Sequence, residues 1–216
     1  MNIKRENLAI LMVTTAFLLG SIQATMVKAA AQHVPFIMLA FILYSVCLLF
    51  YFPLLIRTKL QILKSNRVPL LTIRALAGLA LWFAIYYSLK YIPLVDSTLL
   101  INLSPAWVPI IAWLALKMPI KKQFYLGIGA GFLGAIFILK PDQQVFEWGA
   151  IAALIGGFFM AITLVAVKEL MRTEKSSRIV IYYFLVNTII LLPFAIKCWT
   201  IPSAFILLLL VGNAIL

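Results

Sequence analysis

Apolar residues run through this sequence in long blocks, and charged residues mark the boundaries between the blocks. Each block is roughly 17–25 residues long, the length that an α-helix needs to cross a hydrocarbon core about 30 Å thick. The pattern predicts membrane-spanning helices over residues 8–28, 35–56, 69–90, 93–116, 123–139, 147–168 and 179–197, and an eighth helix that begins near Pro202. The predicted fold is therefore all-α, a polytopic membrane protein.

Composition and charge agree with this fold. The chain is 65% hydrophobic and 11% charged, whereas soluble domains are about 45–50% apolar and about one-quarter charged. With a cytoplasmic N-terminus, fourteen of the 18 Lys and Arg residues fall on the cytoplasmic side, and the other side receives only Lys28, Lys90, Lys140 and Lys197. This asymmetry predicts a multi-pass protein of the inner (cytoplasmic) membrane with its N-terminus in the cytoplasm. Basic residues at helix ends meet the lipid bilayer, so the net charge of +12 predicts no nucleic-acid partner.

One stretch imitates a dinucleotide-binding fingerprint. Gly129, Gly131 and Gly134 have the G-x-G-x-x-G spacing, but they lie inside the predicted helix over 123–139 with no strand before them, as a phosphate-binding turn requires. Small residues four apart, such as Gly127 and Gly131, instead let two helices approach closely in lipid. We therefore expect no cofactor, and we expect these glycines to serve packing within the bundle or a homodimer.

Residues for covalent or metal chemistry are sparse. Cys47 and Cys198 lack metal or redox spacing, and His33 is the single histidine. No phosphate-binding loop for ATP hydrolysis is present. The sequence predicts no metal site and no enzyme.

The chain also matches itself at an offset of 140 residues. Residues 20–53 lie over residues 160–193 without a gap, and Val27-Lys28 and Pro53 superpose on Val167-Lys168 and Pro193. The two copies begin five predicted helices apart, so they cross the membrane in opposite directions. Inverted repeats are typical of secondary transporters, whose substrate site lies near the midplane between the repeats.

Residues 87–141 read YSLKYIPLVDSTLLINLSPAWVPIIAWLALKMPIKKQFYLGIGAGFLGAIFILKP. The segment has an A-L-x-Y-x-P-like turn, a polar pair at the start of a helix, a mid-helix S-P and a glycine-rich helix that ends in K-P. In these features it resembles the EamA-type transporters of the drug/metabolite transporter superfamily. The resemblance implies two five-helix repeats, the first over residues 1–141 and an incomplete second over residues 142–216.

Three departures from the family pattern bear on function. Leu43 stands where family members commonly carry an Arg, and Met118 stands where a Glu is usual. The sequence given ends at Leu216, within the predicted eighth helix, so about seven to eight of the implied ten helices are present. We expect either a fragment of a carrier or a truncated remnant that does not transport.

The helix over 93–116 carries most of the candidate polar residues. Pro105 cannot donate to the carbonyl of Ile101, so a bend is expected there. Thr98, Asn102 and Pro105 follow i, i+4, i+7 spacing and could line a cavity next to Ser104. The alternative is that Asn102 and Ser104 serve as hydrogen-bonding groups between helices.

Charged and aromatic residues complete the candidate site. Asp96 is either a proton- or cation-coupling carboxylate or a cap at a helix N-terminus. Arg74 is either a residue that reaches back to the interface or a contact for a substrate anion. Aromatic and amide groups at depth could form a substrate wall, with lipid-facing positions as the alternative: Trp82, Tyr86, Trp107, Tyr183 and Asn187.

These features favour a secondary transporter that moves a small organic metabolite by alternating access. The resemblance implies an amino-acid-like cargo, with S-adenosylmethionine-like molecules as one option. The alternative is the non-transporting remnant. A membrane enzyme is disfavoured, because paired acids, a metal cluster and an activated nucleophile are all missing from the sequence.

Overall fold

A computed structural model describes four continuous stretches of the chain, residues 35–57, 61–117, 122–139 and 148–198, together with residues 11, 12, 14, 15, 18–22, 25 and 212. The chain forms two compact units. The larger, here called the central unit, comprises Leu55–Asn187, and the second comprises Met1–Leu54 and Thr188–Leu216. The division falls inside two helices, between Leu54 and Leu55 and between Asn187 and Thr188.

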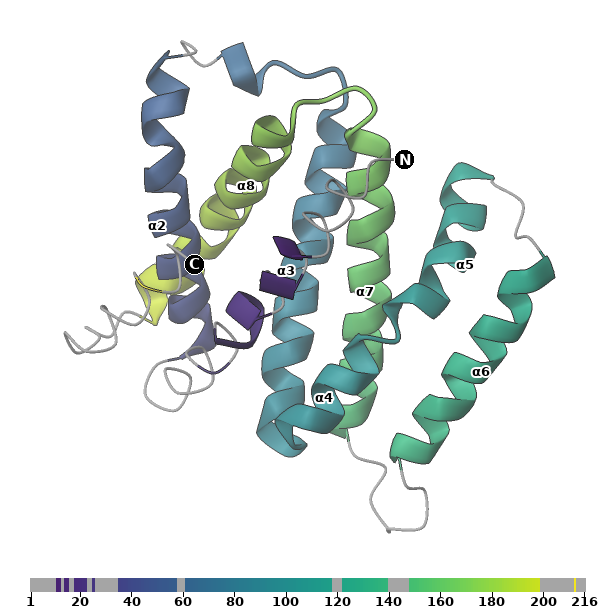
Figure 1. Cartoon of the computed structure of the whole chain (residues 1–216). Helices are drawn as coiled ribbons and strands as arrows, with labels where there is room; N and C mark the ends of the chain where they lie inside the picture. The colour runs from purple at the N-terminus through teal and green to yellow at the C-terminus, as the bar shows by residue number, and fades with distance from the viewer. Residues whose placement is uncertain are drawn as a thin grey trace. The chain divides into compact units, whose positions relative to one another are not determined.

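The described stretches are helical (Figure 1). Their elements are α2 (Phe36–Arg57), the short 3₁₀ helix η1 (Gln61–Leu63), α3 (Val68–Tyr91), α4 (Leu94–Ile101), α5 (Ser104–Leu116), α6 (Lys122–Leu139), α7 (Trp148–Leu170) and α8 (Ser176–Lys197). Five segments are long and apolar enough to cross a membrane: α2, α3, Leu94–Leu116, α7 and α8. The predicted all-α, polytopic membrane fold is confirmed. The helices predicted over 8–28 and from Pro202 onward lie outside the continuously described stretches.

The span predicted over 93–116 is present as Leu94–Leu116, and it is interrupted near its centre. Helix α4 ends at Ile101, and α5 begins at Ser104 with Pro105 in its first turn. Asn102 and Leu103 connect them with ψ angles of 0° and −4°, values that tighten the backbone beyond an α-helix. Pro105 has no N–H for the carbonyl of Ile101 and is well suited to a first helical turn. The proline therefore ends one helix and begins another, where we expected a bend.

Helix α7 is the centre of the central unit, where it packs against α3, α4 and α5 (Figure 1). Its packing face consists of small residues. A Cβ placed on Gly149 would lie 2.8 Å from the Cβ of Tyr91, and one on Gly156 would lie 3.3 Å from the Cβ of Ala84. Ala153 on the same helix is fully buried. Close approach through small residues is the usual way for helices to associate in lipid.

The glycines of α6 have a smaller share in this packing. A Cβ on Gly131 would lie 3.1 Å from Leu103 Cδ1, so this glycine does face α5. Gly127, Gly129 and Gly134 have no described atom within 4 Å of such a position. The expected packing role therefore holds within the described bundle for Gly131, and the tightest glycine contacts lie on α7.

Candidate functional site

A cation and an aromatic ring meet where α3 faces the first half of α8. The guanidinium carbon of Arg74 lies 4.1 Å from the centre of the Tyr183 ring. Gly78, one turn after Arg74, makes room for that ring, since a Cβ there would be 2.6 Å from Tyr183 Cε2. Arginine over an aromatic face is an attractive arrangement, and more so away from water.

Arg74 lies within the span. It is the seventh residue of α3, roughly 9 Å from the helix start at 1.5 Å per residue. Its Nε and Nη1 atoms are buried. The interpretation of Arg74 as a residue that reaches back to the water interface is therefore wrong for these two nitrogens, which lie inside the protein.

Asn187 follows Tyr183 by one turn on the same face of α8, near the middle of that helix. Its side chain is fully buried, and neither its amide nitrogen nor its amide oxygen has a hydrogen-bond partner among the described residues. A buried polar group without a partner costs about 1–3 kcal/mol. The hydrogen-bond partner of such a group is commonly a bound water molecule or a ligand.

Trp82 and Tyr86 continue the sequence of four-residue steps that starts at Arg74 and Gly78. Both aromatic side chains are half-buried. The Lys90 ammonium lies 5.0 Å from the centre of the Tyr86 ring, toward the far end of α3. Because each four-residue step turns by about 40° around the helix, Trp82 lies closer than Tyr86 to the direction of Arg74.

The candidates on α4 and α5 form a second group. Thr98, Asn102 and Pro105 are all exposed, and the break between α4 and α5 falls among them. Ser104 is buried. Trp107 is enclosed in edge-to-face ring contacts with Phe132 of α6 and Phe158 of α7, at centroid distances of 4.9 and 5.4 Å. These contacts make Trp107 a packing residue between three helices, on different elements from the Arg74–Tyr183 pair.

Asp96 is in the first turn of α4, but it is not the cap. The N-cap residue is Pro93, and no side chain caps this helix end by a hydrogen bond. The predicted capping role is therefore wrong. Its position still places a half-buried carboxylate next to the positive end of the helix dipole.

Sequence reasoning missed one buried polar pair. The Ser88 hydroxyl of α3 donates to the Ser97 hydroxyl of α4 at 2.8 Å, and both side chains are fully buried. The two serines are separated by the turn between α3 and α4, so helical periodicity gives no signal for the pair. It joins the ends of two consecutive helices in an otherwise apolar contact.

Taken together, the described groups are suited to binding. A partly buried guanidinium, two aromatic side chains and a buried amide have the chemistry to contact an organic molecule through charge, stacking and hydrogen bonds. Among the described residues, no group of three or more His, Cys, Asp or Glu could hold a metal ion.

Comparison with known proteins extends this description. The EamA-like transporter family matches residues 7–140. The pseudopaline exporter of Pseudomonas aeruginosa is 27% identical over 195 residues, 90% of this chain and 68% of the exporter. A riboflavin transporter of Vibrio cholerae is 26% identical over 225 residues, 100% of this chain and 74% of that protein.

A third relative is the S-adenosylmethionine uptake transporter of Rickettsia prowazekii, 26% identical over 141 residues, 64% of this chain and 48% of the transporter. No solved structure matches the chain. The three relatives carry different small molecules, so they share transport but not a substrate. The family match covers more than half of the sequence, and the chain belongs to the EamA-like transporter family.

Proposed function

We propose that this protein is a secondary transporter that moves a small organic metabolite across the cytoplasmic membrane by alternating access. Its family and the small-molecule transporters among its relatives support the general activity. One observation carries the assignment of a site: the half-buried Arg74–Tyr183 contact next to the fully buried amide of Asn187, which has no partner among the described residues. Ionisable and polar side chains within a membrane span are costly to bury and commonly mark substrate sites.

The chemistry of these groups favours a substrate with a carboxylate and a planar or cationic part. Arginine presents a planar set of donors that matches a carboxylate. The amide of Asn187 offers both a donor and an acceptor, and the rings of Tyr183 and Trp82 offer stacking surfaces. An amino-acid-like or S-adenosylmethionine-like molecule has these features.

The architecture we propose consists of two inverted five-helix repeats, the first over residues 1–141 and the second beginning at residue 142, with the N-terminus in the cytoplasm. The substrate would bind near the midplane between the repeats. Thr98, Asn102 and Ser104, with the break at Pro105, would form a second part of the cavity wall. Asp96 is the proposed coupling carboxylate.

A homodimer remains part of this proposal. Gly127, Gly129 and Gly134 lie along α6 without a described neighbour at the Cβ position. Small residues on an accessible helix face would let a second copy approach closely.

Transport measurements on single-residue variants test the site. The full chain is reconstituted in proteoliposomes, and exchange of labelled S-adenosylmethionine, riboflavin and a mixture of amino acids is recorded. For the substrate that is transported, Arg74→Gln and Tyr183→Leu should lower the initial rate at least about tenfold, while Tyr183→Phe, which keeps the ring, should retain most of it. Lys197→Gln, at an exposed position near the far end of α8, is the control.

Different results would contradict the proposed site and the proposed substrate class. Equal rates in the wild type, Arg74→Gln and Tyr183→Leu would contradict the proposed site. A wild-type protein that is folded and moves none of these compounds would contradict the proposed substrate class.

A further inference from the structure

A polar pocket lies where α3 and α8 begin and α7 ends. It has a volume of about 690 Å³ and is lined by Leu63, Lys64, Ser65, Asn66, Arg67, Thr173, Glu174 and Arg178. All of these residues belong to the central unit. The pocket is independent of the Arg74–Tyr183 site, which lies deeper along α3 and α8.

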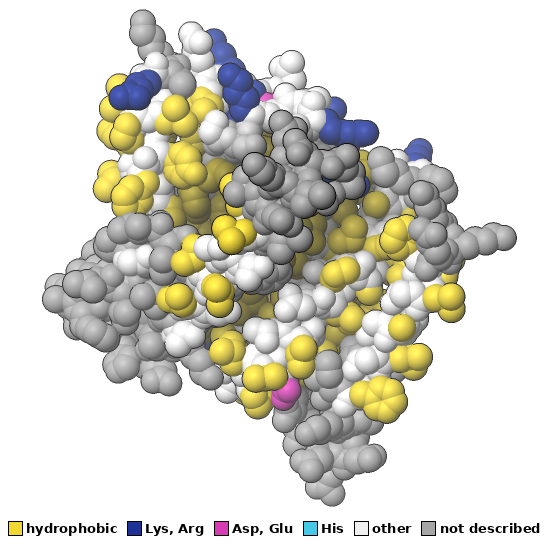
Figure 2. All heavy atoms as spheres, viewed as in Figure 1, with side chains coloured by type: hydrophobic (Ala, Val, Ile, Leu, Met, Phe, Trp, Pro, Cys, Tyr) yellow, Lys and Arg dark blue, Asp and Glu magenta, His cyan; other side chains and the backbone are white. Residues whose placement is uncertain are grey.

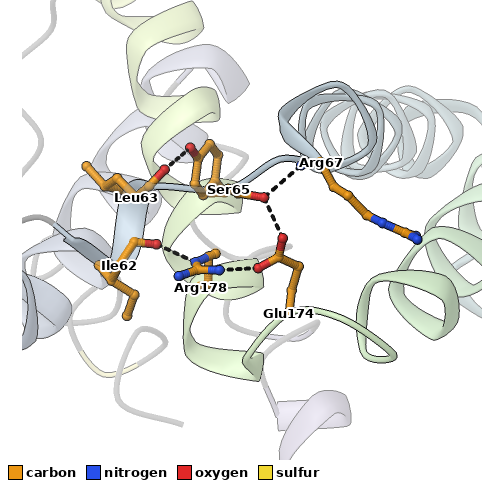
Figure 3. Close-up of polar contacts among 7 residues, drawn as sticks. Ile62, Leu63, Ser65, Arg67, Glu174 and Arg178 are labelled. Atoms are coloured by element: carbon orange, nitrogen blue, oxygen red, sulfur yellow. Dashed lines mark hydrogen bonds and ion pairs between the residues drawn. The ribbon is translucent and has the colours of Figure 1, made fainter.

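Hydrogen bonds between two loops build the wall of this pocket (Figure 3). Arg178 donates from Nε to the carbonyl of Ile62 at 2.6 Å and from Nη1 to Glu174. Ser65 donates to the other oxygen of Glu174 and accepts the backbone N–H of Arg67 at 2.9 Å. The segment before α3 is thereby fixed to the segment before α8.

The same contacts neutralise the one acid of the pocket. The hydrogen bond from Ser65, followed by the hydrogen bond and charge of Arg178, holds the pKa of Glu174 below its usual range against the opposing effect of burial. Glu174 is therefore an ionised carboxylate whose charge is already paired. Lys64 and Arg67 add positive charge to the lining. Arg67 shares Glu169 with Arg172, through N–O distances of 3.1 Å each, so cations outnumber acids around the pocket.

Two helix N-termini reinforce the positive potential. Helix α3 begins at Val68 and α8 begins at Ser176, directly after the lining segments. The first N–H groups of a helix and its dipole favour an anion. Lys64 is exposed, and its ammonium group forms no hydrogen bond or ion pair with any of the described residues, so that group can contact a ligand.

The position of the pocket also brings it to the level of a lipid headgroup. It is next to the ends of three spanning helices, and the hydrophobic side chains of Val68, Ile73 and Met171 are exposed nearby on those ends. Figure 2 shows Lys and Arg side chains near this end of the central unit and hydrophobic side chains over much of the remaining face. Basic pockets between helix ends are suited to anionic headgroups.

From this geometry we propose that the pocket between residues 63–67 and 173–178 binds a phosphate-bearing anion at the membrane surface. Lys64 and Arg67 contact the phosphate oxygens, and Asn66 and Thr173 supply neutral hydrogen bonds. The phosphate comes from an anionic phospholipid headgroup or from a soluble phosphate compound.

Thermal unfolding of the full chain in dodecyl maltoside tests this site. The detergent solution is titrated with dihexanoyl-phosphatidylglycerol, with zwitterionic dihexanoyl-phosphatidylcholine, or with inorganic phosphate, each against sodium chloride at equal ionic strength. The anionic lipid should raise the Tm above the value in phosphatidylcholine. In Lys64→Gln, about fivefold more dihexanoyl-phosphatidylglycerol should be needed to reach half of the maximal Tm shift. Lys197→Gln removes an exposed lysine at the other end of α8 and should behave as the wild type.

The Tm shifts with the two lipids and with inorganic phosphate identify the source of the bound phosphate. A shift by phosphatidylglycerol alone identifies the headgroup as the source, whereas an equal shift by inorganic phosphate identifies a soluble phosphate; both support the site. Equal shifts in the two lipids, or equal losses in Lys64→Gln and Lys197→Gln, would overturn it. Asn66→Asp, which adds a negative charge on an exposed side chain, provides a second variant and should weaken binding more than Lys64→Gln.

Discussion

The carbonyl oxygen of Ile101 lies 3.1 Å from the point that a Cβ on Gly157 would occupy. The carbonyl of Leu100 is 3.2 Å from the same point. Helix α7 thus touches the backbone at the end of α4, where Pro105 leaves the Ile101 carbonyl without its usual donor. The absence of a side chain at residue 157 is what allows this contact.

Gly157→Ala should therefore destabilise the protein. Alanine in place of glycine normally favours a helix by about 1 kcal/mol. Here the added methyl group meets backbone oxygens, which cannot rotate away, and overpacking of this kind costs about 1–3 kcal/mol. Thermal unfolding in detergent measures the difference, with Gly20→Ala as the matched control, because Gly20 is helical and exposed and has no described atom within 4 Å of a Cβ position. A variant as stable as that control would show that α4 and α7 can separate at no cost.

Ser88 and Ser97 should stabilise the turn between α3 and α4 as a pair. Replacing either serine with alanine leaves the other hydroxyl buried without its partner, so each single variant should lose stability, and the double variant should lose less than the sum. Coupling energies of polar pairs inside membrane proteins average about 0.6 kcal/mol. The four unfolding free energies form a double-mutant cycle, and strictly additive losses would contradict the pairing.

Asn187→Leu should separate stability from transport. Leucine has the same number and branching of side-chain heavy atoms and no polar atoms, so its introduction removes the cost of an unpartnered amide and should leave the Tm unchanged or raise it. Transport should nevertheless be lost, because the substrate loses a donor and an acceptor. Thr188→Val is the control, since it removes a neighbouring buried hydroxyl that also lacks a described partner. A fall in Tm with transport intact would indicate a structural role for Asn187.

The stability of the folded protein should decrease at low pH because of Glu174. Its pKa is lower in the folded protein than in the unfolded chain, mainly because Ser65 and Arg178 donate hydrogen bonds to it. The resulting stabilisation is complete above the unfolded pKa and is lost as pH falls through the folded pKa. The Tm of the wild type should therefore fall on acidification below about pH 4.3, the ordinary glutamate value.

Two variants check this assignment. Glu174→Gln should show a shallower fall of Tm with acid and should approach the wild type at the lowest pH. Ser65→Ala removes the largest cause of the lowered pKa and should give an intermediate slope. Identical slopes in all three proteins would show that other carboxyl groups set the acid sensitivity.

The sequence predicted the positions of the helices well, because their hydrophobic length alone decides that a segment spans the membrane. Helix α3 was expected over 69–90 and is Val68–Tyr91, and α7 was expected over 147–168 and is Trp148–Leu170. The contacts between helices were harder to predict. Both α6 and α7 contain several glycines, and only the fold shows that Gly156 and Gly157 meet α3 and α4.

The candidate site was predicted in part. Tyr183 and Asn187 share a face because a four-residue step places them there. The contact of Tyr183 with Arg74 depends on the approach of two helices more than a hundred residues apart in sequence, and helical periodicity carries no such information. The surroundings of Arg74 could not be predicted for the same reason, since the distance from a helix end does not reveal what covers a side chain.

The break between α4 and α5 has a consequence for how sequences of this kind can vary. The oxygen atoms that meet Gly157 belong to the main chain, so no replacement of the Ile101 or Leu100 side chain removes them. Only an exchange of Pro105 would restore the missing N–H donor and let the two helices fuse. Substitutions of the buried Leu100 and Ile101 side chains therefore change the packing around this point, whereas the number of N–H donors available to the Ile101 carbonyl depends on residue 105 alone.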